Sequence, residues 1–301
     1  MNPRISFLLP TRGRPELLRR LFQSIVDTTH DPDNIEIVMC LDEDDLQSQR
    51  IEEPRLNIVK LLGTRSTMGV YNTKCLNHSS GDIIILLNDD LVMETPSWDR
   101  IISDFALTIP DGIFMAYPND TETRQHMCTF PIMSRKTCEI LLQPYPLEYE
   151  ALYIDQHIFD IFIRLKHLGK NRMFYLDNLI FKHNHFINGD VRSDASYAHK
   201  KRFPDAMVFI SLRHMRQVSA RRLLSSIESQ SLPVLPHHVV IEKVPASLPE
   251  AIFKYFNVFF RDYGLPFRRR FILFAGFLRY YAAMEIGLAF LQRKSYTLYG
   301  R

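Results

Sequence analysis

The chain has 301 residues, of which 46% are hydrophobic and 24% charged, and its formal net charge is +3 at pH 7. A chain of this length and apolar content can bury a large core, in one large domain or in a domain with an appendage. The small positive charge, spread along most of the chain, excludes a strongly basic nucleic-acid binder, and we expect no nucleic-acid partner.

The first half of the chain alternates short apolar runs with segments of helical period. Residues 5–9 (ISFLL) predict a strand, and a helix follows with Pro15 in its first turn. Apolar side chains recur on one face of that helix: Leu17, Leu18, Leu21, Phe22, Ile25 and Val26. Residues 35–41, 57–62 and 82–88 are apolar on both faces and predict buried strands. The predicted fold class is therefore α/β, with a mostly parallel sheet flanked by helices.

Polar clusters follow three of these four strands. They are residues 10–14 (PTRGR), 42–45 (DEDD) and 88–90 (NDD). Ligands of parallel α/β sheets bind at the carboxyl ends of the strands, so we expect the three clusters to converge on one site. The chain has no GxGxxG after the first strand and no GxxxxGK[ST], which argues against a dinucleotide fold and a P-loop ATPase.

Asp89 and Asp90 are adjacent at the mouth of a buried strand. Two carboxylates placed there repel each other and lose hydration, and a divalent cation would offset this cost. Mg²⁺ or Mn²⁺ suits such a site, because these ions take one or two carboxylates and complete their shell with water and phosphate oxygens. The pattern therefore indicates a nucleotide diphosphate bound through a metal. The alternative is a solvated turn before a helix at Trp98, since Asp also favours turns.

Three segments in order, SFLLPTRGRPELLRRLFQSI, IEIVMCLDEDD and MGVYNTKCLNHSSGDIIILLNDDLVM, resemble the inverting, family 2-like glycosyltransferases of GT-A fold. The resemblance covers residues 4 to about 200 and implies a Rossmann-like catalytic domain over 1–203. It implies that Asp42 hydrogen-bonds the nucleobase and that Asp90, the last residue of a DxD-type motif, binds Mn²⁺ or Mg²⁺. Asn88 replaces the first Asp of that motif, so metal binding would rest on Asp90.

The resemblance also implies a pocket for a nucleotide-sugar donor. Its expected nucleotide-binding residues are Pro10, Thr11, Arg14, Asp42, Arg65, Asn72 and Asp89, the last of which would support the metal or meet the sugar. Arg14 or Arg65 would contact the base or the phosphates, although either is alternatively a solvated surface charge. UDP is the expected nucleotide, while a guanine nucleotide stays open because Asp42 would suit either base.

Residues 150–169 predict a helix that starts near Asp155. The apolar residues Ile158, Phe159, Phe162 and Leu165 lie on the same face as Asp155, so we expect its carboxylate to point toward the crevice. Inverting transfer needs a base for the acceptor hydroxyl, and the resemblance implies that Asp155 serves as that base. Two alternatives stay open. Asp155 could serve only as an N-cap or first-turn acid of the helix, or the base could be Glu148, Glu150 or Asp160.

A strand-like run from Met173 ends in His183-Asn184-His185. Successive side chains of a strand point to opposite faces, so at most one of these histidines would reach the metal. The resemblance implies a histidine here that completes the metal site or contacts the diphosphate. We favour His183 for this role, with His185 as the alternative. A histidine at this position could instead be a core residue that only forms hydrogen bonds. Asp194 and Tyr197 follow in a segment interpreted as a loop that closes over the diphosphate.

A mainly helical extension is expected over 204–301. Residues 231–253 are rich in proline and read as a linker or strap, and an aromatic and basic segment follows. Residues 271–291 approach the length of a bilayer span, but Arg279 and Glu285 would make a span costly. Two interpretations stay open: an appendage packed on the catalytic domain or on a second subunit, or an in-plane helix over 268–291 with Arg268, Arg269 and Arg270 on anionic lipid.

These observations predict a metal-dependent inverting hexosyltransferase of polysaccharide biosynthesis. It would move a sugar, from UDP by preference, to a hydroxyl of a glycan or a lipid-linked acceptor. Cys40, Cys75, Cys128 and Cys138 lack CxxC spacing, so we expect them to be buried thiols. The start of the chain has no secretory pattern, and we therefore expect a cytoplasmic protein. In one interpretation it lies peripherally on the inner face of the membrane. A homodimer is left open.

Two other classes of function use residues of the same kinds. A sugar nucleotidyltransferase would need a glycine-rich basic loop after the first strand, and PTRGRP fits this poorly. A non-catalytic carbohydrate-binding or assembly protein of the same fold is argued against by Asp42, Asp90, Asp155 and His183, although Asn88 leaves it open.

Overall fold

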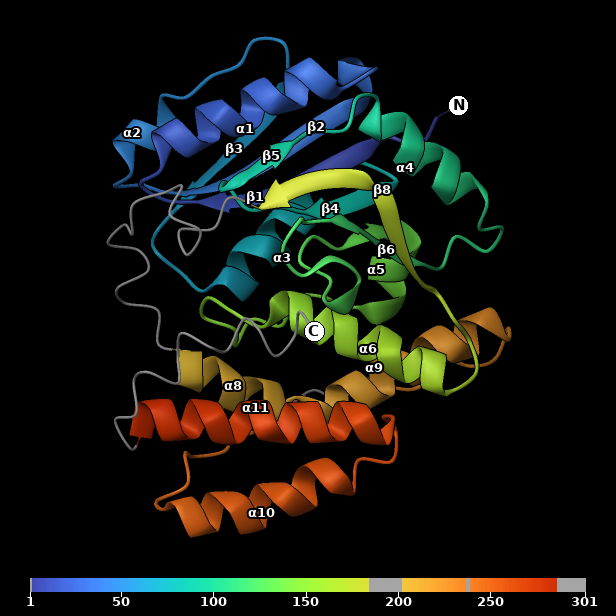
Figure 1. Ribbon diagram of the computed structural model, residues 1–301. Coiled ribbons are helices and arrows are strands. Elements are labelled where there is room, and N and C mark those ends of the chain that lie inside the picture. The colour runs from blue at the N-terminus through green and yellow to red at the C-terminus, as the bar shows by residue number, and fades with distance from the viewer. Residues whose placement is uncertain (1, 184–201, 237–238, 286–301) are drawn as a thin grey trace.

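The computed structural model describes residues 2–183, 202–236 and 239–285. Within these ranges an eight-stranded sheet with the strand order β3-β2-β1-β4-β7-β6-β8-β5 forms the centre of the N-terminal part of the chain, and helices cover both of its faces (Figure 1). The strands are β1 Ile5–Thr11, β2 Ile35–Asp42, β3 Asn57–Gly63, β4 Ile83–Leu86, β5 Leu91–Met93, β6 Met115–Asn119, β7 Ile132–Ser134 and β8 Met173–His183.

Ten α-helices lie in the described ranges, and the first five of them each come next after a strand in the chain, as in βαβ units. They are α1 Pro15–Thr28, α2 Leu46–Gln49, α3 Met68–His78, α4 Trp98–Leu107, α5 Arg135–Leu141, α6 Ile154–His167, α8 Arg202–Ser211, α9 Arg213–Ile227, α10 Leu248–Phe260 and α11 Phe267–Glu285, with short 3₁₀ helices η1 Pro32–Asn34 and η2 Arg124–His126. Helix α1 begins at Pro15, and its buried face includes Leu18, Leu21 and Phe22, as the periodicity predicts.

Strands β3, β2, β1 and β4 run parallel to one another, which confirms the predicted α/β class. Every residue of β1 and β2 is buried. Strand β3 differs from its predicted burial on both faces, because it lies at the edge of the sheet and is mostly half-buried, with Leu62 exposed. Edge position is set by the order of the strands in space, which an apolar run alone does not indicate.

The other half of the sheet is mixed. Strand β7 runs antiparallel to β4 and β6, and β8 runs parallel to β6. The short strand β5 follows Asp90 and pairs antiparallel with the end of β8, so that Leu91 lies opposite His183. This register brings two segments that are about 90 residues apart in sequence to the same point of the sheet edge.

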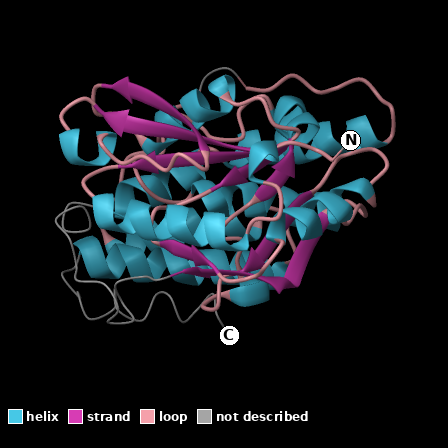
Figure 2. Ribbon diagram, turned by 90° about the horizontal axis from the view of Figure 1, so that it is seen from above, coloured by secondary structure: helices cyan, strands magenta, loops and turns pink. Residues whose placement is uncertain are grey.

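Two apolar cores hold these layers together. Helices α1 and α4 cover one face of the sheet with Phe22, Trp98 and Ile102, and helices α3, α5 and α6 cover the other (Figure 1). The core beneath α6 continues into α8, α9, α10 and α11, which lie on the side away from the sheet (Figure 1). Figure 2 shows the helices and strands from above. All four cysteines are free thiols and buried. The predicted helical C-terminal extension is confirmed, while its start at residue 204 stays a prediction.

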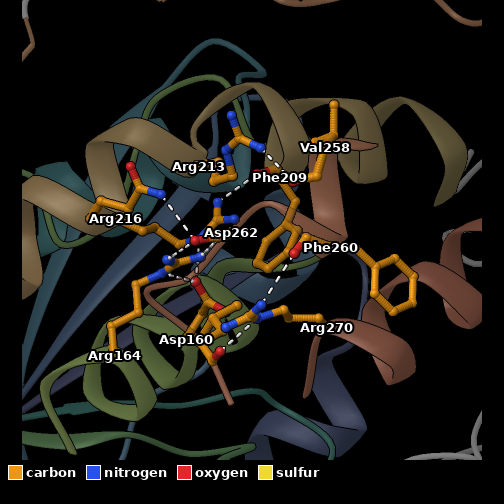
Figure 3. A network of polar contacts seen from close by, with 11 residues as sticks. Asp160, Arg164, Phe209, Arg213, Arg216, Val258, Phe260, Asp262 and Arg270 are labelled. Atoms are coloured by element: carbon orange, nitrogen blue, oxygen red, sulfur yellow. Dashed lines mark hydrogen bonds and ion pairs between the residues drawn. The ribbon is translucent and has the colours of Figure 1, made fainter. Parts of the chain in front are cut away.

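Buried charged side chains join the C-terminal helices to α6 (Figure 3). Asp160 of α6 accepts hydrogen bonds from Nε of Arg164 (2.7 Å) and from Nε of Arg216 on α9 (2.8 Å). Arg164 also forms a bidentate pair, at 2.8 and 2.6 Å, with Asp262 in the turn after α10. Burial alone would raise the pKa of Asp160, but the two arginines outweigh it and hold the pKa below its usual range.

None of the helices in the described ranges combines the length and the apolar content that crossing a bilayer requires.

Candidate active site at the carboxyl edge of the sheet

The three polar clusters lie together at the carboxyl edge of the sheet. Thr11, the last residue of β1, donates a hydrogen bond from Oγ1 to Oδ2 of Asp89 (2.7 Å). The N–H of Gly13 donates to Oδ2 of Asp45 (2.6 Å) after β2. Because β1 is paired on one side with β2 and on the other with β4, the loops after all three strands meet. The parallel order of the strands thus produces one site from three separate segments.

Asp42, the predicted nucleobase residue, is buried at the end of β2 and is held by two groups that the sequence did not reveal. Arg12 donates to Oδ2 of Asp42 and also forms a bidentate pair with Asp44, at 2.7 and 2.8 Å. The hydroxyl of Tyr71 on α3 donates to Oδ1 of Asp42, and burial together with this carboxylate raises the pKa of Tyr71 to about 12. A base bound at Asp42 would therefore meet Arg12 and Tyr71 as well.

The other predicted nucleotide residues have different environments. Pro10 is buried within β1 and Asn72 is buried within α3. Arg14 is nearly buried, and its Nη1 lies 2.7 Å from Oδ1 of Asp89. Arg65 is exposed in the loop after β3, where its charge adds to the stronger effect of the Arg12 hydrogen bond in lowering the pKa of Asp44. Of the two arginines, Arg14 is the one fixed within the site.

The two adjacent aspartates differ in their principal partners, although Arg14 lies near both. Asp89 is engaged by Thr11 and Arg14, while burial raises its pKa against the opposing charge of Arg14. Asp90 faces His183 across the β5 and β8 pairing, with 3.3 Å between its Oδ1 and Nε2 of the imidazole. Asp89 therefore orients an arginine, and Asp90 presents a carboxylate together with an imidazole.

The Asp90 and His183 pair fits a divalent cation. Two neighbouring ligands of an octahedral ion, each at about 2.0–2.1 Å from it, lie about 3 Å apart, close to the observed 3.3 Å. Burial lowers the pKa of His183, but the hydrogen bond and charge of Asp90 outweigh it and raise the pKa overall. Within the described ranges no group of three or more His, Cys, Asp or Glu side chains could hold a metal. A metal here would therefore need water or phosphate oxygens to complete its shell.

Asp155 lies in the first turn of α6, after Tyr153 in the left-handed backbone conformation. Its Oδ1 accepts the N–H of Gln156 (2.7 Å). Burial raises the pKa of Asp155 to about 6, against the lowering effects of that hydrogen bond and of the His183 charge. The charge of His183 thus acts on the carboxylate of Asp155 as well as on that of Asp90.

The alternative bases lie elsewhere. Asp160 is bound by two arginines in the buried network, as described above. Glu148 and Glu150 are exposed in the loop before α6. The carboxylate of Asp205 on α8 holds that loop by accepting the N–H groups of residues 150–152 at 2.7 to 3.0 Å. The C-terminal helices thus support the segment that leads into Asp155.

Asp120, at the end of β6, is a further site residue that sequence reasoning missed. Its buried carboxylate accepts the N–H groups of residues 122–124 and the hydroxyls of Thr123 and Thr129. Its carbonyl accepts the N–H of His183 at 3.1 Å. Asp120 thereby shapes the loop that contacts His183, although its PND sequence indicates only a turn. The alternative ligand His185 and the loop residues Asp194 and Tyr197 lie outside the described residues.

The sheet with its carboxyl-edge site is that of a GT-A glycosyltransferase, and comparisons with known proteins agree. Residues 6–157, half of the chain, match the model of glycosyl transferase family 2, so the chain belongs to this family. It is a glycosyltransferase that takes its sugar from a nucleotide sugar. No curated protein sequence matches the chain.

Two solved structures illustrate the shared fold. One is the mannosyltransferase PcManGT from Pyrobaculum calidifontis in complex with GDP-Man and Mn²⁺, with 12% identity and a TM-score of 0.51, covering 100% of this chain and 84% of that one. The other is S. aureus TarS 1–349 in complex with UDP-GlcNAc, with 14% identity and a TM-score of 0.53, covering 98% and 89%. At these identities the similarity supports the fold alone.

Proposed function

We propose that the protein is a metal-dependent inverting hexosyltransferase. It transfers a sugar from a nucleotide diphosphate, with UDP favoured, to a hydroxyl of a glycan or lipid-linked acceptor. The observation that carries this proposal is the pair of Asp90 and His183, 3.3 Å apart at the carboxyl edge of the sheet, together with the carboxylate of Asp155 in the first turn of α6, whose pKa burial raises to about 6. A metal-binding pair and a carboxylate with a raised pKa are the two parts that inverting transfer needs.

The donor half of the site is formed by Asp42, Arg14 and Asp90. The carboxylate of Asp42 accepts hydrogen bonds from the imide of the base, and it exchanges its contacts with Arg12 and Tyr71 for some of these. Arg14 lies 2.7 Å from Asp89 and 3.9 Å from Asp90, so its charge is fixed beside the place where the leaving diphosphate develops negative charge. When bound by Asp90 and His183, Mn²⁺ or Mg²⁺ supplies further positive charge there.

Asp155 provides the acceptor half of the chemistry. Its carboxylate takes the proton from the acceptor hydroxyl as that oxygen attacks the anomeric carbon opposite the diphosphate. A pKa of about 6 keeps it ionised at neutral pH while leaving it more basic than an exposed aspartate. No covalent enzyme intermediate is required.

The donor site is tested by calorimetric titration of UDP, GDP, CDP and ADP with and without Mn²⁺. We expect one nucleotide to bind in a metal-dependent way, and Asp90→Ala to weaken that binding by about 10- to 100-fold because a first ligand of the metal is lost. Asp104→Ala, at an exposed position of α4, is the matched control and should bind as the intact chain does. Failure of every nucleotide to bind would contradict the transferase proposal and leave a binding or assembly protein of this fold.

The pH profile tests the base. Because Asp155 must be deprotonated to accept a proton, kcat/KM should be constant well above pH 6 and fall about tenfold per pH unit below it. Nucleotide affinity measured over the same range separates this loss from protonation of His183, which would weaken metal binding. A profile that does not change between pH 5 and 8, with donor binding intact, would exclude Asp155 as the base.

A further inference from the structure

Helices α10 and α11 form a hairpin in the outermost layer of the molecule, on the side away from the sheet (Figure 1). Six phenylalanines of the hairpin, here termed the phenylalanine face, are exposed or half-buried: Phe253, Phe256, Phe260, Phe267, Phe271 and Phe274. Four of them are strongly exposed, at 77% for Phe253, 66% for Phe267, 56% for Phe271 and 49% for Phe256. Single exposed apolar residues are common, but such a concentration in one place marks an interaction surface.

The phenylalanine face is continuous across the two helices. The ring of Phe260 stacks on Phe256 with centroids 4.4 Å apart and lies 5.6 Å from both Phe267 and Phe274. On α10 the phenylalanines recur every three or four residues, and the opposite side of the helix is buried through Ala251 and Tyr255. The hairpin therefore has a separate inner surface that already holds it to the protein. Phe260 and Phe274 are half-buried and also pack against the core, whereas packing does not account for the four exposed rings.

Cationic side chains border this face. Arg261 and Arg268 are exposed beside it, and Lys254 is exposed with an ion pair to Glu242 at 2.8 Å. Between residues 248 and 283 the hairpin has two acidic residues. Asp262 is buried against Arg164, and Glu250 lies in the first turn of α10. The surface is thus apolar in its centre and positive at its border.

The structure corrects the expectation that three consecutive arginines point to lipid. Arg269 is buried, with its guanidinium 5.5 Å from the ring of Phe159 on α6. Arg270 donates to the carbonyls of Leu265 and Phe260 within the hairpin. Only Arg268 of the three is exposed, so the charge at the border of the face comes from Arg268 with Arg261.

We infer that the phenylalanine face docks on an anionic lipid surface. The rings enter the boundary between headgroups and acyl chains, and Arg261 and Arg268 lie among the phosphates, which is the arrangement that in-plane amphipathic helices adopt. A second copy of the chain fits less well, because a two-fold contact through this face would bring its positive borders together. Lipid binding needs no sugar nucleotide, so this inference stands apart from the proposed function.

Vesicle sedimentation tests the inference on the full chain. We expect the protein to bind vesicles of phosphatidylcholine mixed with phosphatidylglycerol more tightly than vesicles of phosphatidylcholine alone, and to lose affinity as salt is added. The double variant Phe253→Gln with Phe271→Gln should bind about tenfold more weakly or worse, because two rings no longer leave water. Arg261→Glu with Arg268→Glu should abolish the preference for the anionic vesicles.

Matched variants on α4 control for general effects of polarity and charge. Leu107→Gln removes a 65% exposed apolar side chain, and Arg100→Glu reverses an exposed arginine, and both should leave vesicle binding unchanged. Thermal unfolding of every variant establishes that it is folded. Independently, Phe271→Trp should shift its emission to the blue on anionic vesicles, against the constant background of buried Trp98.

Two results would overturn the inference. One is that the intact chain binds neither kind of vesicle. The other is that light scattering shows a dimer, which the Phe253 and Phe271 variant converts to a monomer without any change in vesicle binding. The second result would assign the face to self-association instead.

Discussion

Replacing Asp155 with Asn is expected to lower kcat by about 10²- to 10⁴-fold, the range that a positioned general base contributes. The change keeps the shape of the side chain and removes its ability to take a proton. The assay is UDP release, in the presence of Mn²⁺, from whichever UDP-sugar the intact chain turns over fastest. The affinity for UDP should stay within about twofold, because Asp155 takes no part in the proposed donor site.

The same variant should not lose stability, and this separates a catalytic role from a structural one. Burial raises the folded-state pKa of Asp155 to about 6, above the usual value of 3.8. The carboxylate therefore destabilises the folded state at neutral pH, and the intact chain gains stability as pH falls from about 6 toward 4. We expect Asp155→Asn to unfold at the same or a higher temperature at pH 7 and to lack that dependence on pH.

Two outcomes of the Asp155→Asn experiment would redirect the assignment. Full activity would exclude Asp155 and turn attention to Glu148 and Glu150 in the loop held by Asp205. A large loss of stability would show instead that Asp155 serves mainly as a first-turn acid of α6. Asp104→Asn, at an exposed position of α4, should match the intact chain in both activity and stability.

Sequence reasoning succeeded where local pattern fixes position. A buried strand ends in the sequence where its apolar run gives way to polar residues. Parallel strands place such ends at the same edge of the sheet, so the meeting of the loops after β1, β2 and β4 was predictable. The contact of Asp90 with His183 is different, because it depends on the register of β5 with β8. Family resemblance supplied the two residues, but no local pattern in the sequence indicates that register, because it pairs segments far apart in the chain.

The residues that were missed act through distant contacts. Arg12 and Tyr71 approach Asp42 from positions about 30 residues away on either side. Asp120 reads as an ordinary turn residue until its loop is folded. In such cases the chemistry of the residue is visible in the sequence, whereas its partner is not.

The bounds of helix α9 were not predicted from the sequence, for a different reason. Its buried side includes Arg216 and Arg222 along with apolar residues, so it shows no clean apolar stripe. The arginines are buried because the fold supplies acceptors, namely Asp160 and the carbonyl of Phe209 for Arg216, and the carbonyls of Ile140 and Pro233 for Arg222. A helix whose packing depends on paired charges cannot be found from hydrophobic period alone.

The buried network around Asp160 should be the most sensitive point of the fold. Asp160→Asn removes the negative charge that faces both Arg164 and Arg216, each 2% exposed. Arg164 then keeps Asp262, and Arg216 keeps only the carbonyl of Phe209, so positive charge stays buried without a full partner. Such a loss typically costs about 3–5 kcal/mol, a large part of a domain's free energy of unfolding. Urea unfolding monitored by circular dichroism measures the change. The exposed pair of Lys170 with Glu228, at 3.4 Å, provides the control, and Lys170→Met should cost at most about 1 kcal/mol.

The dependence on pH identifies the network as the cause. The folded-state pKa of Asp160 is held below its usual value of 3.8, so its contribution is complete above that pH and is lost as the pH falls further. The intact chain should therefore lose stability steeply below about pH 4, and Asp160→Asn should lose less over the same interval because part of the effect is already gone. Equal acid sensitivity in both proteins would show that the arginines are satisfied elsewhere. In that case the attachment of α9 and of the hairpin turn to α6 would rest on apolar packing instead.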